Sequence, residues 1–372
     1  MSLILALVGG TSQMQPAQAS PTATEGGTGT TAAAVQGLAP TPTPTDAAPV
    51  PAAPAAAPAR DVFVFFNMVK QDGGFNAMAY DAARDAEERG EVRVRTRVTA
   101  DNNVVEQAVT AFAKRDGGHV VFVSNSYEPV VERLSDRHPH LRFTIIDSAL
   151  DRPNTEAIQF REDEASYLAG MAAALTVETG RFGFIGGMPI DAVTRFGCGF
   201  IQGILSIRPE AEIDGIYLSN WVDGFRDVDR ARRTAGNMVD RGAGVILVAA
   251  GLAGTGALEE IAVRGRFGIG VDTNQNGLFP GHILTSVVKR VDMEVARVLR
   301  EAGTPEFRSG VRRAGLAEGA VDIVIDEYNR ARLAPVMDRI DAARRDIMSG
   351  ALAVLPARQV PACTPLLQGP RS

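Results

Sequence analysis

Cysteine and histidine are scarce in this chain of 372 residues. It contains two cysteines, Cys198 and Cys363, and four histidines, and neither cysteine has a second Cys or His at metal-ligand spacing. This pattern excludes zinc ribbons, redox CxxC motifs and disulfide-rich scaffolds, so we expect no metal. Cys198 is expected to be a buried, inert thiol, and pairing with Cys363 after export is the alternative.

Positive charge is also limited. The 38 Lys and Arg residues are outnumbered by 44 Asp and Glu, which gives a formal net charge of -6, and no basic run is present. Nucleic acid is therefore not an expected partner. Lysine occurs only at positions 70, 114 and 289, so a lysine near a predicted cleft is notable. No stretch reaches the ~20 apolar residues that a membrane-spanning helix requires.

The first 60 residues lack the material for a hydrophobic core. They carry three charges and nine of the 21 prolines. We expect a signal peptide over 1–19, with an apolar stretch from Leu3 to Val8 and a small-x-small site at Ala17–Ala19, followed by a disordered tether over 20–60. The expected location is periplasmic or cell-surface. A low-complexity tail on a cytosolic protein is the alternative.

From Asp61 onward, short apolar runs alternate with amphipathic segments, which is typical of βαβ units in parallel sheets covered by helices on both faces. Strands are predicted at 62–66, 92–98, 119–123, 142–147, 155–160, 181–185, 213–218, 244–249, 267–271, 283–287 and 321–325. Helices are predicted at 75–89, 102–114, 127–137, 164–179, 195–207, 227–241, 255–264, 291–302 and 332–349. The fold class is therefore α/β, with two doubly wound parallel-sheet lobes.

The lobe boundaries follow from where this rhythm restarts. Lobe 1 is expected to comprise 61–160 plus about 286–310, and lobe 2 to comprise 161–285 plus about 311–355. Residues 356–372 are expected to form a tail.

Polar and aromatic residues gather just after the predicted strands. Open parallel sheets bind ligands outside the carboxyl ends of their strands, so the loops of two facing lobes would line a shared cleft. The candidates there are Asp72, Phe75, Asn76, Ser124, Asp147, Phe196, Trp221, Gly251 and Asp272. Aromatic faces with carboxylates and amides suit a small, planar, neutral ligand rich in hydroxyl groups.

Seven segments, in order along the chain, resemble the basic membrane protein family of ABC-transporter substrate-binding lipoproteins, which includes purine nucleoside receptors. They are DGGFN (72–76), FREDEASYLAGMAAAL (160–175), GFIGGM (183–188), RFGCGF (195–200), GAGVILVAAG (242–251), GIGVDTNQN (268–276) and LTSVVKRVD (284–292). The resemblance implies a type I periplasmic-binding fold whose two lobes are joined by three hinge crossings. The lipid-bearing cysteine of the family has no counterpart here, so the expected membrane association is a peripheral one through the permease.

The resemblance also implies roles for the base-binding residues. Phe75 would stack on one face of a nucleobase, with Asn76 and Asp72 as polar neighbours. Trp221 would cover the other face, and Asp147 would hydrogen-bond to the base edge. The alternatives are a core aromatic for Phe75, a lobe-edge residue for Trp221 and a turn-forming residue for Asp72.

The sugar-binding residues follow from the same resemblance. Asp272 and Lys289 would form a pair that holds the ribose hydroxyls, and Gly251 would let the backbone approach the sugar. Phe196 would add to the aromatic wall, although a core position is the alternative. An ordinary surface ion pair is the alternative for Asp272 and Lys289.

The resulting expectation is a monomeric, extracytoplasmic receptor that delivers a nucleoside to an ABC transporter permease, and the family resemblance implies a purine nucleoside. A simple sugar or another small ligand, bound for uptake or for sensing, is the first alternative. A nucleoside hydrolase is the second, since Asp72 and Asp272 are candidate acid and base. Against an enzyme, GxGxxG, GxxxxGK[ST] and GxSxG are absent from the strand ends, so no cofactor is expected.

Overall fold

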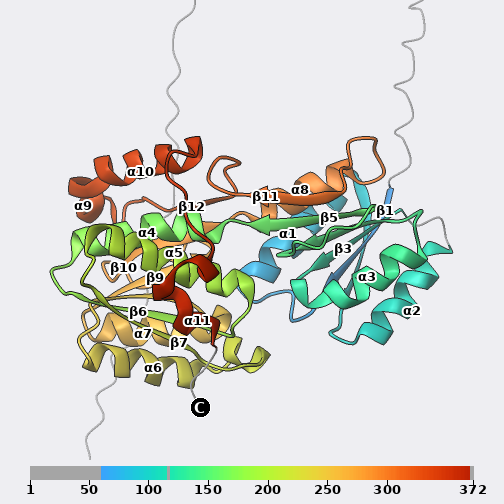
Figure 1. The fold of residues 1–372 in the computed structure, drawn as a ribbon. Coiled ribbons are helices and arrows are strands. Elements are labelled where there is room, and N and C mark those ends of the chain that lie inside the picture. Colours follow the sequence, from blue (N-terminus) through green and yellow to red (C-terminus); the bar gives the residue numbers. More distant parts are fainter. Residues whose placement is uncertain (1–59, 115–117, 369–372) are drawn as a thin grey trace, which may run out of the picture. The chain divides into compact units, whose positions relative to one another are not determined.

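Two six-stranded sheets organise the chain (Figure 1). The computed structural model describes residues 60–114 and 118–368, which belong to a single compact unit. The expected signal peptide, and the tether up to residue 59, lie outside the described residues. Within the described residues, no helix is long and apolar enough to cross a membrane.

The first sheet has the strand order β11-β5-β4-β3-β1-β2, and all of its strand pairs are parallel. Its strands are β1 (Arg60–Phe66), β2 (Val92–Val98), β3 (His119–Val123), β4 (Arg142–Ile146), β5 (Thr155–Phe160) and β11 (Gly310–Ala314). Its helices are α1 (Phe75–Glu88), α2 (Asn102–Ala113), α3 (Glu128–Arg137) and α8 (Val291–Glu301).

The second sheet has the order β12-β10-β9-β8-β6-β7, in which β12 alone runs antiparallel to its neighbour. Its strands are β6 (Arg181–Gly186), β7 (Glu212–Tyr217), β8 (Val245–Ala249), β9 (Phe267–Asp272), β10 (Ile283–Lys289) and β12 (Val321–Ile323). Its helices are α4 (Glu162–Thr176), α5 (Asp191–Ile207), α6 (Val228–Asp240) and α7 (Gly254–Val263), and α9 (Arg330–Leu333), α10 (Met337–Ser349) and α11 (Thr364–Leu367) follow near the C-terminus.

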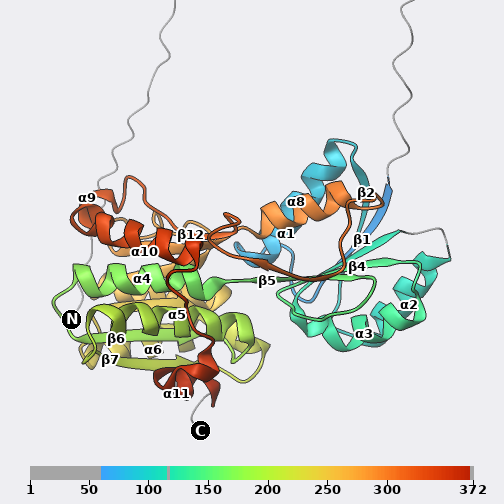
Figure 2. The same ribbon diagram turned by 45° about the horizontal axis from the view of Figure 1, so that its top comes forward.

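Alternation along β1 explains why helices cover both faces of the first sheet. Val62, Val64 and Phe66 pack into one hydrophobic cluster, together with residues of α1 and α8. Phe65, between them, packs into another cluster with residues of α2 and α3. Successive strand side chains point to opposite faces. Figures 1 and 2 accordingly show α1 and α8 on one face and α2 and α3 on the other. The predicted α/β fold is confirmed.

The chain passes between the two sheets three times, after β5, β10 and β11. Backbone hydrogen bonds tie these crossings together: Arg161 N donates to Ala314 O at 2.9 Å, and Arg290 N donates to Ala320 O at 2.8 Å. Any rotation of one lobe against the other must therefore act on this one bundle of crossings.

The strand positions correct two expected lobe boundaries. The second sheet extends through β10 to Lys289, beyond the expected boundary at 285, and β11 places 310–314 in the first sheet. The sequence pattern missed β11 because it is a short edge strand, GVRRA, whose two arginines interrupt the apolar alternation.

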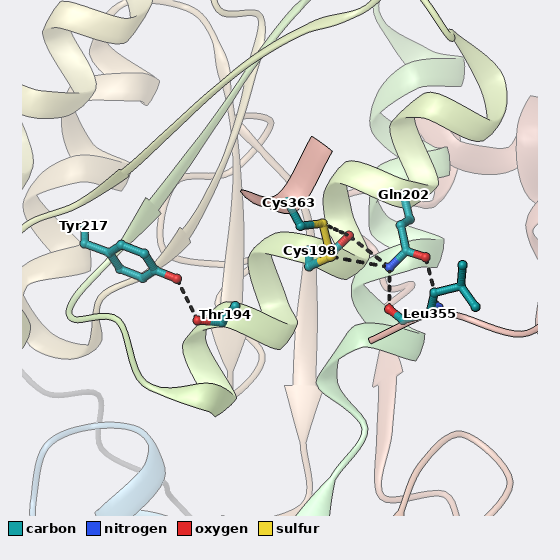
Figure 3. The surroundings of a disulfide bond; sticks show 6 residues. All are labelled: Thr194, Cys198, Gln202, Tyr217, Leu355 and Cys363. Carbon is teal, nitrogen blue, oxygen red and sulfur yellow. Dashed lines mark hydrogen bonds between the residues drawn. A yellow bond between two sulfur atoms is a disulfide. The ribbon is translucent and has the colours of Figure 1, made fainter. Parts of the chain in front are cut away.

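The expectation of an inert Cys198 thiol is wrong. Cys198 of α5 is disulfide-bonded to Cys363 in the expected tail (Figure 3). Gln202, one turn along α5, donates to Leu355 O and accepts from Leu355 N, both at 3.0 Å. Leu366, 2% exposed, fills a space that a methyl group on Gly197 or Gly215 would occupy. The C-terminal segment is thus fastened to α5.

We predict that this fastening contributes to global stability. The disulfide closes a loop with a sequence separation of 165 residues, so Cys363→Ser should lower the free energy of unfolding by about 2–5 kcal/mol. Guanidinium denaturation with and without reductant measures this loss. Reductant should destabilise the wild-type chain to the level of the variant and leave the variant unchanged. Equal stability of wild type and variant without reductant would contradict the prediction.

Candidate functional site

Three residues at the carboxyl ends of strands have strained backbones. Ser124 after β3, Asp147 after β4 and Asp272 at the end of β9 have φ values of 147°, 66° and 68°. Among the described residues, they are the only ones other than glycine with positive φ. Each such conformation costs about 1–3 kcal/mol and persists only where the surroundings hold it, commonly at functional sites. All three are predicted site residues.

Lys289 is buried where the two lobes meet. It is 2% exposed and ends β10 of the second sheet, and its Nζ lies 2.6 Å from Asp147 Oδ1 of the first lobe. Burial lowers the pKa of Lys289, but the neighbouring carboxylates of Asp147, Glu162 and Asp272 outweigh it and raise the pKa to about 12. Lys289 is therefore positively charged at neutral pH.

Asp272 was the expected ion-pair partner of Lys289, but the structure pairs the lysine with other carboxylates. Lys289 forms ion pairs with Asp147 and with Glu162, whose Oε1 lies 2.8 Å from Nζ. Within the described residues, no ion pair includes Asp272. Asp147 and Glu162 flank the lysine from the first lobe and from the first crossing, so they neutralise it at shorter range.

Glu162 and Arg195 complete this buried charge network, and sequence reasoning missed both. Arg195 Nε donates to Glu162 Oε2 at 2.6 Å. Burial raises the pKa of Glu162, but Arg195 and Lys289 together outweigh it and hold the pKa below its ordinary value. Gly199 allows α5 to approach α4 closely enough for Arg195 to reach Glu162. A methyl group at Gly199 would overlap the backbone of Asp163 in α4.

Asp272 carries an unusual charge equilibrium. Burial raises its pKa to about 7; Lys289 opposes this shift, whereas Asp147, Asp72 and Glu162 add to it. A methyl group on Gly74 of the first lobe would lie 3.8 Å from Asp272 Oδ2. Asp272 thus faces the loop before α1.

That loop is built by Asp72. Its carboxylate accepts hydrogen bonds from the backbone nitrogens of Gly74, Asn76 and Ala77 at 3.0–3.1 Å, and from the Asn76 side chain at 2.8 Å. Asp72 therefore has the turn-forming role that was its alternative interpretation. It also presents Phe75, whose ring centroid is 4.8 Å from Lys289 Nζ. The buried Asn76 Oδ1 has no hydrogen-bond partner in the part of the chain that the structure describes.

Two of the predicted aromatic residues stand apart from this arrangement. Phe196 is 3% exposed and belongs to the hydrophobic core, which is the alternative stated for it, and Trp221 is 75% exposed. Phe225, which the sequence analysis overlooked, lies beside Gly187 after β6 and Gly251 after β8. The sequence signal for Phe225 is its place in the segment after β7, four residues beyond Trp221.

A polar recess of about 400 Å³ adjoins the network. Its walls include Asn125 next to Ser124, and also Asp147 and Arg195. Arg195 Nη2 is buried and has no hydrogen-bond partner among the described residues. The site can therefore receive further polar groups beside Asp147.

A comparison with family models matches residues 59–354 to the family described as ABC transporter substrate-binding protein PnrA-like. The match covers both sheets and all three crossings. The matched family is one of substrate-binding proteins, so the match gives no support to the alternative of a nucleoside hydrolase.

Individual proteins show the same similarity. The chain is 30% identical over 242 residues to the CD4+ T-cell-stimulating antigen of Listeria monocytogenes, covering 60% of this chain and 66%, just under two thirds, of that protein. It is 26% identical over 306 residues to the ABC transporter nucleoside-binding protein BmpA of Lactococcus lactis, covering 76% of this chain and 85% of that protein.

A solved structure of an ABC transporter solute-binding protein from Aeropyrum pernix K1 superposes with a TM-score of 0.68 at 25% identity, covering 79% of this chain and 92% of that chain. The expected type I periplasmic-binding fold is confirmed by this similarity together with the two parallel-sheet lobes.

Asp272 generates a prediction about stability and pH. Because its folded pKa of about 7 exceeds its ordinary value of 3.8, the folded chain binds more protons than the unfolded chain between these values. Stability from this group therefore falls as pH rises through that window. Asp272→Asn should stabilise the ligand-free chain. The gain in the free energy of unfolding should be larger at pH 8 than at pH 5, by about 1–3 kcal/mol. Thermal denaturation at both pH values measures this difference.

Asp136→Asn is the matched control, because Asp136 is exposed on α3. Its effect on the unfolding temperature should be the same at both pH values. An Asp272→Asn effect that is equally independent of pH would contradict the assignment of a raised pKa.

Proposed function

The chain belongs to the family of PnrA-like ABC transporter substrate-binding proteins, and from this premise we propose that it is an extracytoplasmic receptor for a nucleoside. A purine nucleoside fits best. The receptor acts as a monomer, closes its two lobes around the ligand and delivers it to an ABC transporter permease.

One observation carries the ligand assignment: an aromatic ring and two strained carboxylates surround a single buried lysine. Phe75 and Asp147 approach Lys289 from the first lobe, and Asp272 lies close enough to influence its charge. An apolar ring suits the face of a base, whereas charged groups suit hydroxyls. A nucleoside combines both features in one molecule.

The sugar is assigned to Asp272 and Lys289. The Asp272 carboxylate accepts hydrogen bonds from vicinal hydroxyls, and the Lys289 ammonium donates one, so both contacts are charge-assisted. Gly251, with φ of 53° at the start of the 3₁₀ turn after β8, brings backbone close to the same strand ends. Ionised Asp272 is the binding form, so affinity for ribosides falls as pH drops below about 7.

The base is assigned to the aromatic residues and to Asp147. Phe75 stacks on one face of the base. Asn76 Oδ1, which has no hydrogen-bond partner among residues 60–114 and 118–368, and the Asp147 carboxylate accept hydrogen bonds from the base edge. For the second face, Phe225 is better placed than Trp221, because it adjoins Gly251 while Trp221 projects into solvent. We therefore assign no contact with the base to Trp221.

The disulfide supports a location outside the cytoplasm. Structural disulfides form in oxidising compartments and are rare in the cytosol. The Cys198–Cys363 bond therefore agrees with a receptor in the periplasm or at the cell surface. In this proposal the receptor associates with the membrane peripherally, through its permease.

A thermal-unfolding screen of the purified chain tests the function. After unfolding and refolding to remove carried ligand, the chain is mixed with adenosine, guanosine, inosine, cytidine, uridine, free bases, ribose and glucose. A ligand at ~1,000 times its dissociation constant stabilises by about 4.1 kcal/mol, a shift of several degrees. Nucleosides should give this shift. A shift with sugars alone would replace the nucleoside by a sugar, and release of free base would identify a hydrolase.

The aromatic assignment gives a second prediction. Phe75→Ala and Phe225→Ala should each weaken nucleoside binding by about 1–3 kcal/mol, the usual contribution of one base-stacking contact. Isothermal titration calorimetry measures these losses. Trp221→Ala serves as the matched aromatic control and should bind as the wild type does. A loss in Trp221→Ala with none in Phe225→Ala would reverse the assignment of the second ring.

A further inference from the structure

Glu162 is a buried carboxylate that no ligand can reach. It is the first residue of α4, directly after the first crossing, and its side chain is 0% exposed. Both of its oxygens lie against cations, Oε1 at 2.8 Å from Lys289 Nζ and Oε2 at 2.6 Å from Arg195 Nε. Any contribution to ligand binding must therefore pass through these neighbours.

The surroundings fix the Lys289 ammonium in one place. Asp147 and Glu162 face it, and the rings of Phe75 and Phe160 lie 4.8 Å and 4.9 Å from Nζ. An ammonium group has three hydrogen-bond donors. Asp147 Oδ2 accepts a hydrogen bond from Nζ at 2.7 Å, and Glu162 Oε1 lies 2.8 Å from Nζ as an ion-pair partner. With one donor directed at each carboxylate, one donor is left for a ligand.

We propose that Glu162 is a positioning residue that holds the Lys289 ammonium with its third donor directed at the ligand's sugar. That the third donor points at a sugar rests on the proposed function, because the proposed function takes a riboside as the ligand. That Glu162 holds the Lys289 ammonium in place rests on the observed contacts alone. Arg195 keeps Glu162 in place from the second lobe, so the lysine is set at the crossing before ligand arrives.

Charge explains why a carboxylate is needed at this position. Without Glu162, Lys289 and Arg195 would share one buried region with Asp147 as the nearest remaining carboxylate. The lysine would then move fully toward Asp147 in the first lobe, away from the sugar. An uncompensated buried cation is strongly unfavourable, which makes the geometry sensitive to this one residue.

Glu162→Gln tests the proposal, with Glu156→Gln as the matched control. Glu156 is also a buried carboxylate, 4% exposed and paired with Arg297 at 2.6 Å, but it lies in β5 away from Lys289. Both variants lose one buried ion-paired charge. Only Glu162→Gln should lower riboside affinity, about 10-fold to 100-fold, as expected for one charge-assisted hydrogen bond. Affinity for the free base should change much less.

A second readout needs no ligand. The chain has three lysines, so isotope-labelled lysine gives three sets of NMR signals, and Lys289→Arg identifies the one from Lys289. The Lys289 titration midpoint should fall by about one to three pH units in Glu162→Gln and stay unchanged in Glu156→Gln. Asp147 and Asp272 remain near the lysine in both variants, so the difference reports Glu162 alone.

The outcomes separate the two proposals. If the wild-type chain binds no nucleoside, the proposed function fails, and the Lys289 midpoint still decides whether Glu162 holds the lysine. An unchanged midpoint in folded Glu162→Gln, or a lowered midpoint with unchanged riboside affinity, would overturn the positioning role. If Glu162→Gln does not fold, Glu162→Asp replaces it. Its retracted carboxylate should give smaller losses in both readouts, and wild-type values would overturn the proposal.

Discussion

The contact between the two lobes of this chain depends on the burial of one lysine between carboxylates. Lys289 ends a strand of the second sheet, Asp147 follows a strand of the first, and Glu162 begins the helix after the first crossing. Separately, each buried charge would be strongly unfavourable; together they compensate one another. The same contact joins the two lobes and places a cation at the strand ends. In the proposed receptor, the residues that join the lobes are also the ones that contact the ligand.

The backbone conformations and the buried carboxylate at the strand ends near this lysine lower the stability of the folded chain. Ser124, Asp147 and Asp272 adopt backbone conformations that favour glycine, and the raised pKa of Asp272 shows that its charge is poorly solvated before a ligand arrives. A ligand that donates hydrogen bonds to Asp272 would stabilise its ionised form. Since a ligand shifts the open-closed equilibrium only through differential affinity, such a contact can drive closure of the lobes.

Much of the fold could be predicted from periodicity, because the buried strands are apolar and the helices amphipathic. The bounds predicted for β2 and β3 match those observed, whereas the short, arginine-containing β11 was missed. The positions of Asp147 and Asp272 at strand ends identified both as candidates, but the sequence did not reveal that Asp147 pairs with Lys289. Tertiary packing alone brings Glu162 to Lys289 and Cys198 to Cys363, across many intervening residues. In sequence, Glu162 is one acidic residue in the charged segment REDE, without any sign of burial. Phe196 shows the converse, since an aromatic near a strand end also fits the core.

The most direct test of this account is a crystal structure of the protein with a bound purine nucleoside. The account predicts the base against Phe75 and the ribose hydroxyls within hydrogen-bond distance of both Asp272 and Lys289, with Glu162 still bonded to the lysine. A nucleoside bound elsewhere, or a Lys289 ammonium that contacts only Asp147 and Glu162 in the complex, would contradict it.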